Sequence, residues 1–265
     1  MSLSIIIVVA YLALGAVAGI IGGLLGLGGG IVIVPALLLV FIQQGFPTES
    51  LMHLAVATSL ATIVFTSVSS TWAHHRKLAV DWKIVRFLAP GIVLGAFLGA
   101  VIADRTDSDS LRVLFGIFEV LVALQIWTGI TPGAMRQLPR KPGMIFAGGG
   151  IGMLSTILGI GGGTLTVPFL LWCNVNIRNA VATSAACGFP IALAGCIAMI
   201  ITGWNRPGLP ENTLGYVFWP AALGILVTSI LTAPMGARLA HRLPVQTLKR
   251  IFAIVLAGIG IRMLI

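Results

Sequence analysis

Residues 19–35 read Gly-Ile-Ile-Gly-Gly-Leu-Leu-Gly-Leu-Gly-Gly-Gly-Ile-Val-Ile-Val-Pro, with three consecutive glycines between two strongly apolar runs. Glycine has no Cβ, so it adopts left-handed backbone angles and lets another segment or a ligand contact the main chain. Within a bilayer, irregular backbone is tolerated where protein or a polar cavity covers it, because hydrocarbon supplies no hydrogen-bond partners. The stretch therefore predicts a broken membrane helix whose break is covered by protein or by a polar cavity.

The pattern occurs a second time, at residues 152–168, which read Gly-Met-Leu-Ser-Thr-Ile-Leu-Gly-Ile-Gly-Gly-Gly-Thr-Leu-Thr-Val-Pro. Gly28 corresponds to Gly161 and Pro35 to Pro168, a constant shift of 133 residues. Later segments also recur: Ala55-Val-Ala-Thr-Ser59 as Ala180-Val-Ala-Thr-Ser184, and Leu111-Arg-Val-Leu-Phe115 as Leu248-Lys-Arg-Ile-Phe252. The matches cover the beginning, middle and end of each half, so the chain is an internal duplication.

The composition is that of a membrane protein. Of 265 residues, 58% are hydrophobic and only 9% are charged, with a mean hydropathy of +1.07. Soluble domains carry roughly 25% charged residues. At about 20 residues per crossing, the apolar material suffices for about eight to ten transmembrane segments. The net charge of +9 comes from basic residues in short loops, which favours membrane topology over nucleic-acid binding as its cause.

We expect an all-α polytopic membrane protein. Apolar segments are predicted at 4–25, 31–41, 53–72, 84–103, 111–127, 143–158, 163–173, 180–202, 214–239 and 248–264. Residues 1–130 form the first transmembrane repeat, 131–142 a cytoplasmic linker, and 143–265 the second repeat. The two shortest segments, 31–41 and 163–173, either cross fully or re-enter, and the sequence leaves both options open.

Charge counting predicts the relative orientation of the repeats. Twelve Lys and Arg residues fall in odd-numbered loops between the ten segments and three in even-numbered loops, so the odd loops are expected on the cytoplasmic side. Both termini then lie outside, and equivalent loops of the two halves lie on opposite faces. This predicts two inverted-topology repeats whose glycine-broken helices meet near the midplane, a recurring transporter design.

The paired Gly-Leu-Gly-Gly-Gly…Pro and Gly-Ile-Gly-Gly-Gly…Pro segments, each followed by Ala-Val-Ala-Thr-Ser, resemble the sulfite exporter TauE/SafE family, also called the toluene sulfonate uptake permeases. The resemblance covers essentially the whole chain. It implies a carrier in the prokaryotic cell (inner) membrane that moves small sulfur-containing anions such as sulfite, sulfonates or thiosulfate-like compounds. It does not single out one anion.

A small oxyanion needs N–H donors and positive potential, and a helix N-terminus supplies both. Such ends are predicted where the glycine triplets open a helix, with hydroxyls on neighbouring segments as further donors. The candidate substrate-binding residues are Gly28, Gly29, Gly30, Thr58, Ser59, Gly161, Gly162, Gly163, Thr183 and Ser184. The alternative is structural: glycines also allow close helix packing, and Ser and Thr hydroxyls often bond their own helix.

Other residues carry weaker signals. Glu119 is the only acidic residue well inside an apolar run, which makes it a candidate for proton coupling or a structural partner of a nearby polar group. His53 is expected to anchor the chain at the membrane interface. Glycines spaced by four, Gly15-Gly19-Gly23 and Gly91-Gly95-Gly99, favour helix packing. The three cysteines lack metal-site spacing, so no metal or cofactor is expected.

The function predicted from these features is secondary transport, by alternating access, of a small sulfur-containing anion, with export as the expected direction. A carrier for another small inorganic or organic anion is the first alternative. An intramembrane enzyme would need a nucleophile–base pair or metal ligands at membrane depth, and a scaffold would leave the broken helices unexplained. Expected partners are the anion and membrane lipid, without nucleic acid; the sequence is also compatible with a homo-oligomer.

Overall fold

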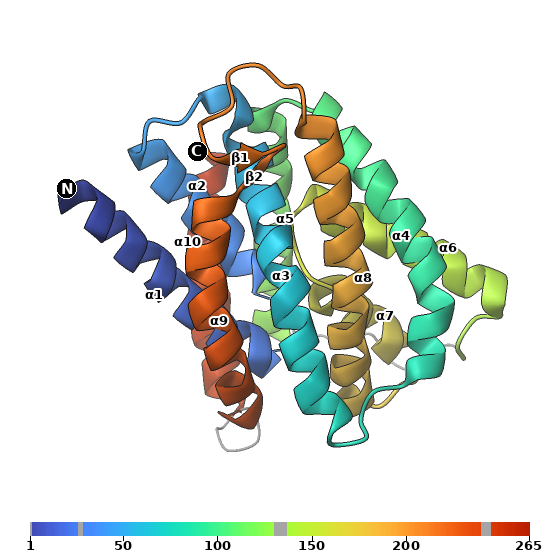
Figure 1. The fold of residues 1–265 in the computed structure, drawn as a ribbon. Coiled ribbons are helices and arrows are strands. Elements are labelled where there is room, and N and C mark those ends of the chain that lie inside the picture. Colours follow the sequence, from blue (N-terminus) through green and yellow to red (C-terminus); the bar gives the residue numbers. More distant parts are fainter. Residues whose placement is uncertain (1, 26–28, 130–136, 240–244) are drawn as a thin grey trace.

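The computed structural model describes residues 2–25, 29–129, 137–239 and 245–265, which form one bundle of helices (Figure 1). The α-helices in this part of the chain are α1 (Ser2–Leu25), α2 (Gly30–Gln43), α3 (Leu51–His75), α4 (Trp82–Arg105), α5 (Ser108–Thr128), α6 (Lys141–Ile157), α7 (Gly163–Trp172), α8 (Ile177–Gly203), α9 (Trp219–Leu239) and α10 (Val245–Leu264). A 3₁₀ turn, η1 (Thr48–Ser50), precedes α3, and two short strands, β1 (Thr213–Leu214) and β2 (Val217–Phe218), precede α9.

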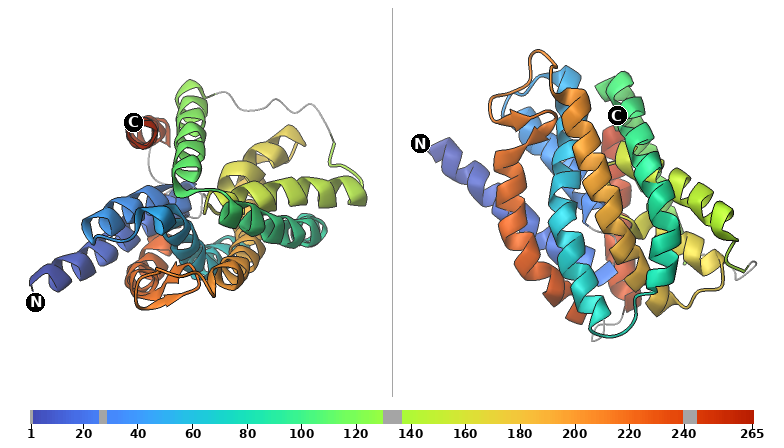
Figure 2. Two further views of the ribbon diagram at one scale, coloured as in Figure 1. Left: turned by 90° about the horizontal axis from the view of Figure 1, so that it is seen from above. Right: turned by 45° about the vertical axis from the view of Figure 1, so that its right-hand side comes forward.

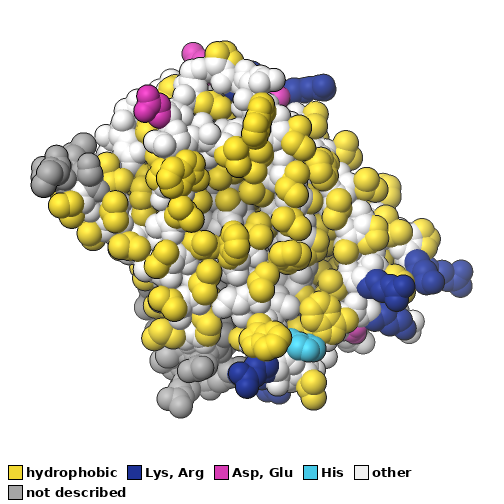
Figure 3. All heavy atoms as spheres, viewed as in Figure 1, with side chains coloured by type: hydrophobic (Ala, Val, Ile, Leu, Met, Phe, Trp, Pro, Cys, Tyr) yellow, Lys and Arg dark blue, Asp and Glu magenta, His cyan; other side chains and the backbone are white. Residues whose placement is uncertain are grey.

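Six of the described helical segments are long and apolar enough to cross a membrane. They are Ile5–Gly23, Thr48–His75, Trp82–Arg105, Ser108–Thr128, Ile177–Gly203 and Trp219–Gly236. Gly30–Gln43, Gly163–Trp172 and Ala253–Leu264 are shorter apolar helices. Hydrophobic side chains cover most of the surface seen in Figure 3, and charged side chains lie toward its edges. The chain is therefore a multi-pass α-helical membrane protein.

Helix α3 is the centre of the bundle. In its apolar window 78% of the residues are buried inside the protein, against 28% for α1. It packs against α8 and α9 and is also contacted by α2 and α5 (Figure 2). Because lipid surrounds the outer helices, an inner helix is where polar side chains are tolerated best.

The helix pairs that join the two halves occur in equivalent sets. Helix α1 packs on α9 as α6 packs on α4, and α3 packs on α9 as α8 packs on α4. The pair α5 and α10, which are themselves counterparts, lies side by side in Figure 2. These pairings are those expected if the duplicated segments fold alike.

Side-chain caps begin several of these helices. Asp81 Oδ1 accepts the N–H groups of Lys83 and Ile84 at the start of α4, at 3.0 and 3.2 Å. Asp107 Oδ1 accepts the Ser110 N–H at 2.8 Å at the start of α5. Such caps satisfy N–H groups that have no partner within the helix. The polar residues between apolar runs thus set where these helices start.

The four-spaced glycines do pack helices, as expected. A Cβ on Gly91 or Gly95 would overlap the α6 backbone at Ile145 or Gly149. On α1, a Cβ on Gly19 would lie 2.8 Å from the Ser229 Cα of α9. Only glycine permits this approach, because any larger residue would push the two backbones apart.

Each of the ten predicted segments contains a helix, with one correction near residue 214. The predicted segment 214–239 begins with the hairpin β1–β2, in which Thr213 pairs with Phe218, and helix α9 starts only at Trp219. Asn212 and Gly215 have φ angles of 65° and 55°, in the left-handed region, so the chain turns where the sequence suggested a continuous helix.

Candidate substrate site at the two glycine breaks

The two glycine breaks meet inside the bundle. Helix α2 begins after Gly29, whose φ angle of 79° is left-handed and whose carbonyl accepts the N–H groups of Val32 and Ile33. A Cβ on Gly30 would lie 2.5 Å from the Gly159 carbonyl oxygen and 2.9 Å from the Ile160 Cα, in the break that precedes α7. The first break therefore packs directly on the second.

Helices α3 and α8 hold the second break from two sides. The Ser59 hydroxyl of α3 donates a buried hydrogen bond of 2.7 Å to the Gly159 carbonyl. On the other side, a Cβ on Gly162 would lie 2.7 Å from the Ser184 carbonyl oxygen of α8 and 3.1 Å from the Gly188 nitrogen. Both repeated Ala-Val-Ala-Thr-Ser segments thus contact the same break.

Thr58 and Thr183, which are equivalent in the two repeats, have the same structural role. Thr58 Oγ1 accepts the Phe218 N–H at 3.0 Å, and Thr183 Oγ1 accepts the Asp81 N–H at 3.0 Å. Phe218 and Asp81 immediately precede α9 and α4, which are also equivalent. Each threonine therefore ties the start of one helix to another helix of the bundle, Thr58 to α3 and Thr183 to α8.

A small cavity adjoins the second break. Its walls come from α1, α3, the start of α7, α8 and α9. The lining includes the hydroxyl-bearing residues Thr66, Ser67, Ser70 and Ser184 and the glycines Gly162 and Gly188. Gly19 and Gly23 of α1 also line it, so these two packing glycines additionally shape the cavity.

The predicted site residues divide between this cavity and the packing around it. Gly162 and Ser184 line the cavity, and Gly161 and Gly163 are buried beside Gly162. Gly29, Gly30, Thr58, Ser59 and Thr183 make the buried contacts described above rather than the cavity wall. Gly28 lies outside the described residues.

The sequence interpretation missed Thr66, Ser67 and Ser70. The hydroxyls Ser59, Thr62, Thr66 and Ser70 recur every three or four residues, which places them along one face of a helix. All four are buried. This periodicity within an apolar segment was the signal that could have indicated a polar face on α3.

The cavity hydroxyls differ in what they offer a ligand. Thr66 donates to the Thr62 carbonyl at 3.1 Å, and Ser67 donates to the Val64 carbonyl at 2.9 Å. The Ser70 hydroxyl is buried, with 7% of the residue exposed, and has no hydrogen-bond partner among the residues described. Ser70 is therefore the donor still available on this wall, while Thr66 and Ser67 present oxygen atoms.

Glu119 lies apart from this cavity. It is fully buried on α5, and its Cβ is 3.1 Å from where a Cβ on Gly260 of α10 would stand. Neither carboxyl oxygen has a hydrogen-bond partner in the described part of the chain. A buried carboxyl without a partner in a membrane helix is a candidate functional group.

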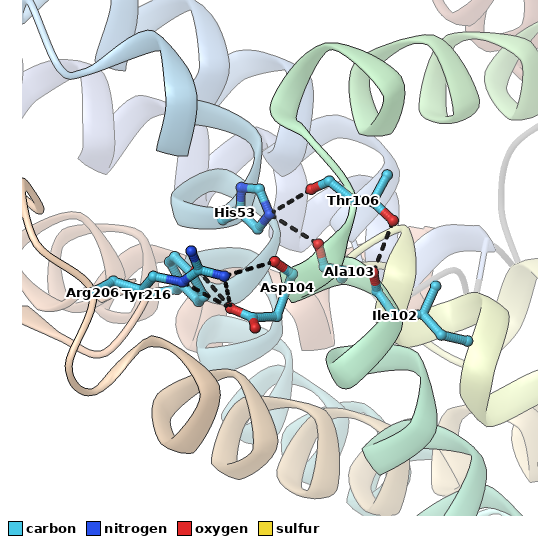
Figure 4. A network of polar contacts seen from close by, with 7 residues as sticks. All are labelled: His53, Ile102, Ala103, Asp104, Thr106, Arg206 and Tyr216. Carbon is cyan, nitrogen blue, oxygen red and sulfur yellow. Dashed lines mark hydrogen bonds and ion pairs between the residues drawn. The ribbon is translucent and has the colours of Figure 1, made fainter.

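A network of polar contacts lies at the end of α3 that is uppermost in Figure 1. Figure 4 shows its members, which include His53, Asp104, Arg206 and Tyr216. His53 is 4% exposed, so the expected interfacial anchor is wrong. Its Nε2–H donates to the carbonyls of Ala103 and Thr106, at 2.9 and 3.1 Å, because both partners can only accept. His53 thereby binds two carbonyls at the end of α4 and just after it, of which that of Ala103 also accepts the Thr106 N–H at 3.1 Å.

The same network joins the loop after α8 to α4. Asp104 Oδ1 accepts the Tyr216 hydroxyl at 2.8 Å and the Arg206 Nη2–H at 3.1 Å, and the Tyr216 ring stacks on His53. Burial, and next the hydrogen bond to Asp104, raise the pKa of Tyr216 above its ordinary value. The neutral phenol is thus the form that this end of the fold holds.

Comparison with known proteins agrees with this architecture. A model of the sulfite exporter TauE/SafE family matches residues 11–263. A probable membrane transporter protein of Haemophilus influenzae is 39% identical over 253 residues, covering 95% of this chain and 96% of the relative. The probable membrane transporter protein YunE of Bacillus subtilis is 31% identical, covering 97% of each chain.

A third relative, a probable membrane transporter protein of Methanocaldococcus jannaschii, is 29% identical over 95% of this chain and 93% of its own length. No solved structure matches the chain significantly. The names of family and relatives indicate a membrane transporter rather than an enzyme. With matched segments running almost from end to end, the chain belongs to the sulfite exporter TauE/SafE family.

Proposed function

We propose that the protein is a secondary carrier that exports a small sulfur-containing oxyanion across the prokaryotic inner membrane, and that the cavity beside Gly162 holds the anion. The observation that carries this proposal is the contact between the two glycine breaks with a hydroxyl-lined cavity next to it. Helix α7 begins at Gly163, so the positive end of its dipole lies at the cavity wall.

Alternating access is supported by the arrangement of the two halves. In Figure 1, α3 runs from the upper end to the lower end, while its counterpart α8 runs the opposite way. Antiparallel counterparts are what two inverted repeats would produce, with residues 1–130 and 143–265 as the halves and 131–142 as the linker. Rocking of one half against the other would open the cavity to each side in turn.

The charged side chains support one orientation. In Figure 3, most of the Lys and Arg side chains lie toward the lower end and the lower right-hand edge, while one basic group lies at the upper right beside an acidic side chain. Under the positive-inside rule the lower end is cytoplasmic, which leaves both termini outside. The cavity residues of α3, Thr66 to Ser70, belong to the half of that helix nearest the cytoplasmic end.

Glu119 is proposed to carry a proton during transport. It is buried without a partner in the described chain, so a proton taken up there would be held away from water. Because it lies on α5 and not at the cavity, its coupling would act through movement of the α5–α10 pair. The variant Glu119→Gln would then make the flux of the anion insensitive to an imposed pH gradient.

The proposal is tested by flux of labelled sulfite into liposomes that contain the purified protein. The variants Gly29→Leu and Gly162→Leu should insert but lose transport, because a Cβ there would lie 3.0 Å or 2.7 Å from a backbone oxygen and would displace the glycine breaks without the direct backbone overlap found at Gly95. Gly150→Leu is the matched control, since a Cβ there meets nothing within 4 Å. Normal flux in both site variants would place the pathway elsewhere, and absence of flux in the wild-type protein would refute the carrier.

The second candidate function is transport of a different small anion by the same cavity. Hydroxyls and helix N-terminal amides recognise oxygen atoms and do not distinguish strongly between sulfur oxyanions and carboxylates. Acetate in the same flux assay addresses this candidate, and acetate transport exceeding sulfite transport would favour it.

A further inference from the structure

Among the residues that the structure describes, those that line the cavity carry no charged side chain. We infer that the cavity selects singly charged oxyanions, such as hydrogensulfite or a small alkanesulfonate, over doubly charged ones. This inference rests on the proposed function and adds the charge of the substrate to it.

The first step concerns the donors. Ser70 is 93% buried, lines the cavity, and has a hydroxyl without a partner among the described residues. Gly162 also lines the cavity, directly before the ten-residue helix α7. A hydroxyl and a helix N-terminus can stabilise one negative charge, and together they supply partial positive charge only.

The second step concerns the acceptors. Thr66 and Ser67 use their hydroxyl protons for the carbonyls of Thr62 and Val64. Their oxygen atoms, which carry partial negative charge, are what remains for a ligand. These atoms repel additional negative charge, and they can accept a hydrogen bond from a protonated oxyanion such as hydrogensulfite.

The third step compares how the two energies grow with charge. The energy lost on removing an ion from water rises with the square of its charge, so it is about fourfold larger for a dianion than for a monoanion of equal size. The attraction to fixed dipoles and hydrogen-bond donors rises only in proportion to the charge, about twofold. Because the described lining holds no cation, the second charge of a dianion is poorly compensated.

The basic residues near the cavity act earlier in the pathway. Arg76 and Lys77 follow the end of α3, beyond Ser70, and both are exposed. Screened surface charges raise the local concentration of anions of either charge. The lining of the cavity, and not this basic surface, therefore discriminates between monoanions and dianions.

Methanesulfonate and sulfate test the inference, because they are tetrahedral, similar in size, and differ by one charge. Each labelled anion is offered to liposomes containing the wild-type protein. We expect methanesulfonate to be taken up at least about tenfold faster, given the uneven growth of the two energies with charge. We also expect sulfite flux to fall as the pH is raised through neutrality, where hydrogensulfite loses its proton.

The variant Ser70→Lys places a cation on the wall and should shift the preference toward sulfate, whereas Ser69→Lys, at a half-buried position that does not line the cavity, should not. If Ser70→Lys does not fold, Ser70→Ala replaces it and should reduce methanesulfonate flux severalfold relative to Ser69→Ala. Sulfate flux equal to or above methanesulfonate flux in the wild-type protein overturns the inference and leaves the carrier standing. Absence of flux for every anion refutes the carrier and the inference together.

Discussion

The two equivalent threonines allow a quantitative test of what holds the bundle together. Thr58→Val and Thr183→Val keep the side-chain shape and remove the oxygen that accepts the N–H of Phe218 or Asp81, each at 3.0 Å. A buried N–H group left without a partner lowers the free energy of unfolding by about 1–3 kcal/mol. The two bonds have the same length, so they differ only in their surroundings.

Those surroundings predict unequal effects. The bond from Phe218 to Thr58 is buried, and Phe218 itself is 8% exposed, so water cannot easily replace the lost acceptor. The bond from Asp81 to Thr183 is only partly buried and lies at the end of the bundle. We therefore expect Thr58→Val to lower the unfolding free energy by about 1–3 kcal/mol and Thr183→Val by less than about 1 kcal/mol.

The assay is reversible unfolding of the purified protein in mixed micelles with increasing SDS, followed by circular dichroism. Thr58→Ser and Thr183→Ser are the controls, because serine retains the accepting oxygen and should restore most of the loss. Equal losses in the two valine variants would refute the argument from burial. A valine variant as stable as its serine control would show that the hydrogen bond contributes nothing.

Three further predictions concern packing and the polar network. Gly95→Leu should prevent a stable fold, because its side chain would overlap the Gly149 backbone of α6, whereas Gly150→Leu should fold normally. Size-exclusion chromatography of the two purified variants tests this difference. Asp104→Asn should lower the unfolding free energy by about 1 kcal/mol, because the neutral amide binds Arg206 and Tyr216 less strongly than the carboxylate does, and both bonds are partly exposed. The SDS titration measures this difference. An unchanged unfolding free energy would show that the network does not stabilise the fold. The unfolding free energy should fall as the pH rises above 10, because Tyr216 in the unfolded chain loses its proton at its ordinary pKa of 10.0 while Tyr216 in the folded protein retains it. The variant Tyr216→Phe should flatten this part of the curve of unfolding free energy against pH. A curve that is unchanged in this variant would contradict the raised pKa of Tyr216.

Much of the fold could be predicted from the sequence because the signals are local. Hydropathy reports which segments leave water, and the bilayer obliges such segments to satisfy their backbone groups as helices. The four-spaced glycines of α4 likewise indicated a packing face, and Gly91 and Gly95 do contact α6. Local signals failed at residues 213–218, where the left-handed φ angles of Asn212 and Gly215 turn an apolar run into a hairpin.

The sequence by itself determined the membrane class, the duplication, the glycine breaks and the family resemblance, since each is written in residue type and spacing. Only the tertiary structure decided which side chains meet. Thr58 and Ser59 are adjacent in the chain, yet one contacts Phe218, 160 residues away, and the other Gly159, 100 residues away. Ser70 became a cavity residue because α1, α7, α8 and α9 leave space beside it. Spacing gives the face of a helix on which a residue lies, and the packing of distant helices decides whether that face meets protein, cavity or lipid.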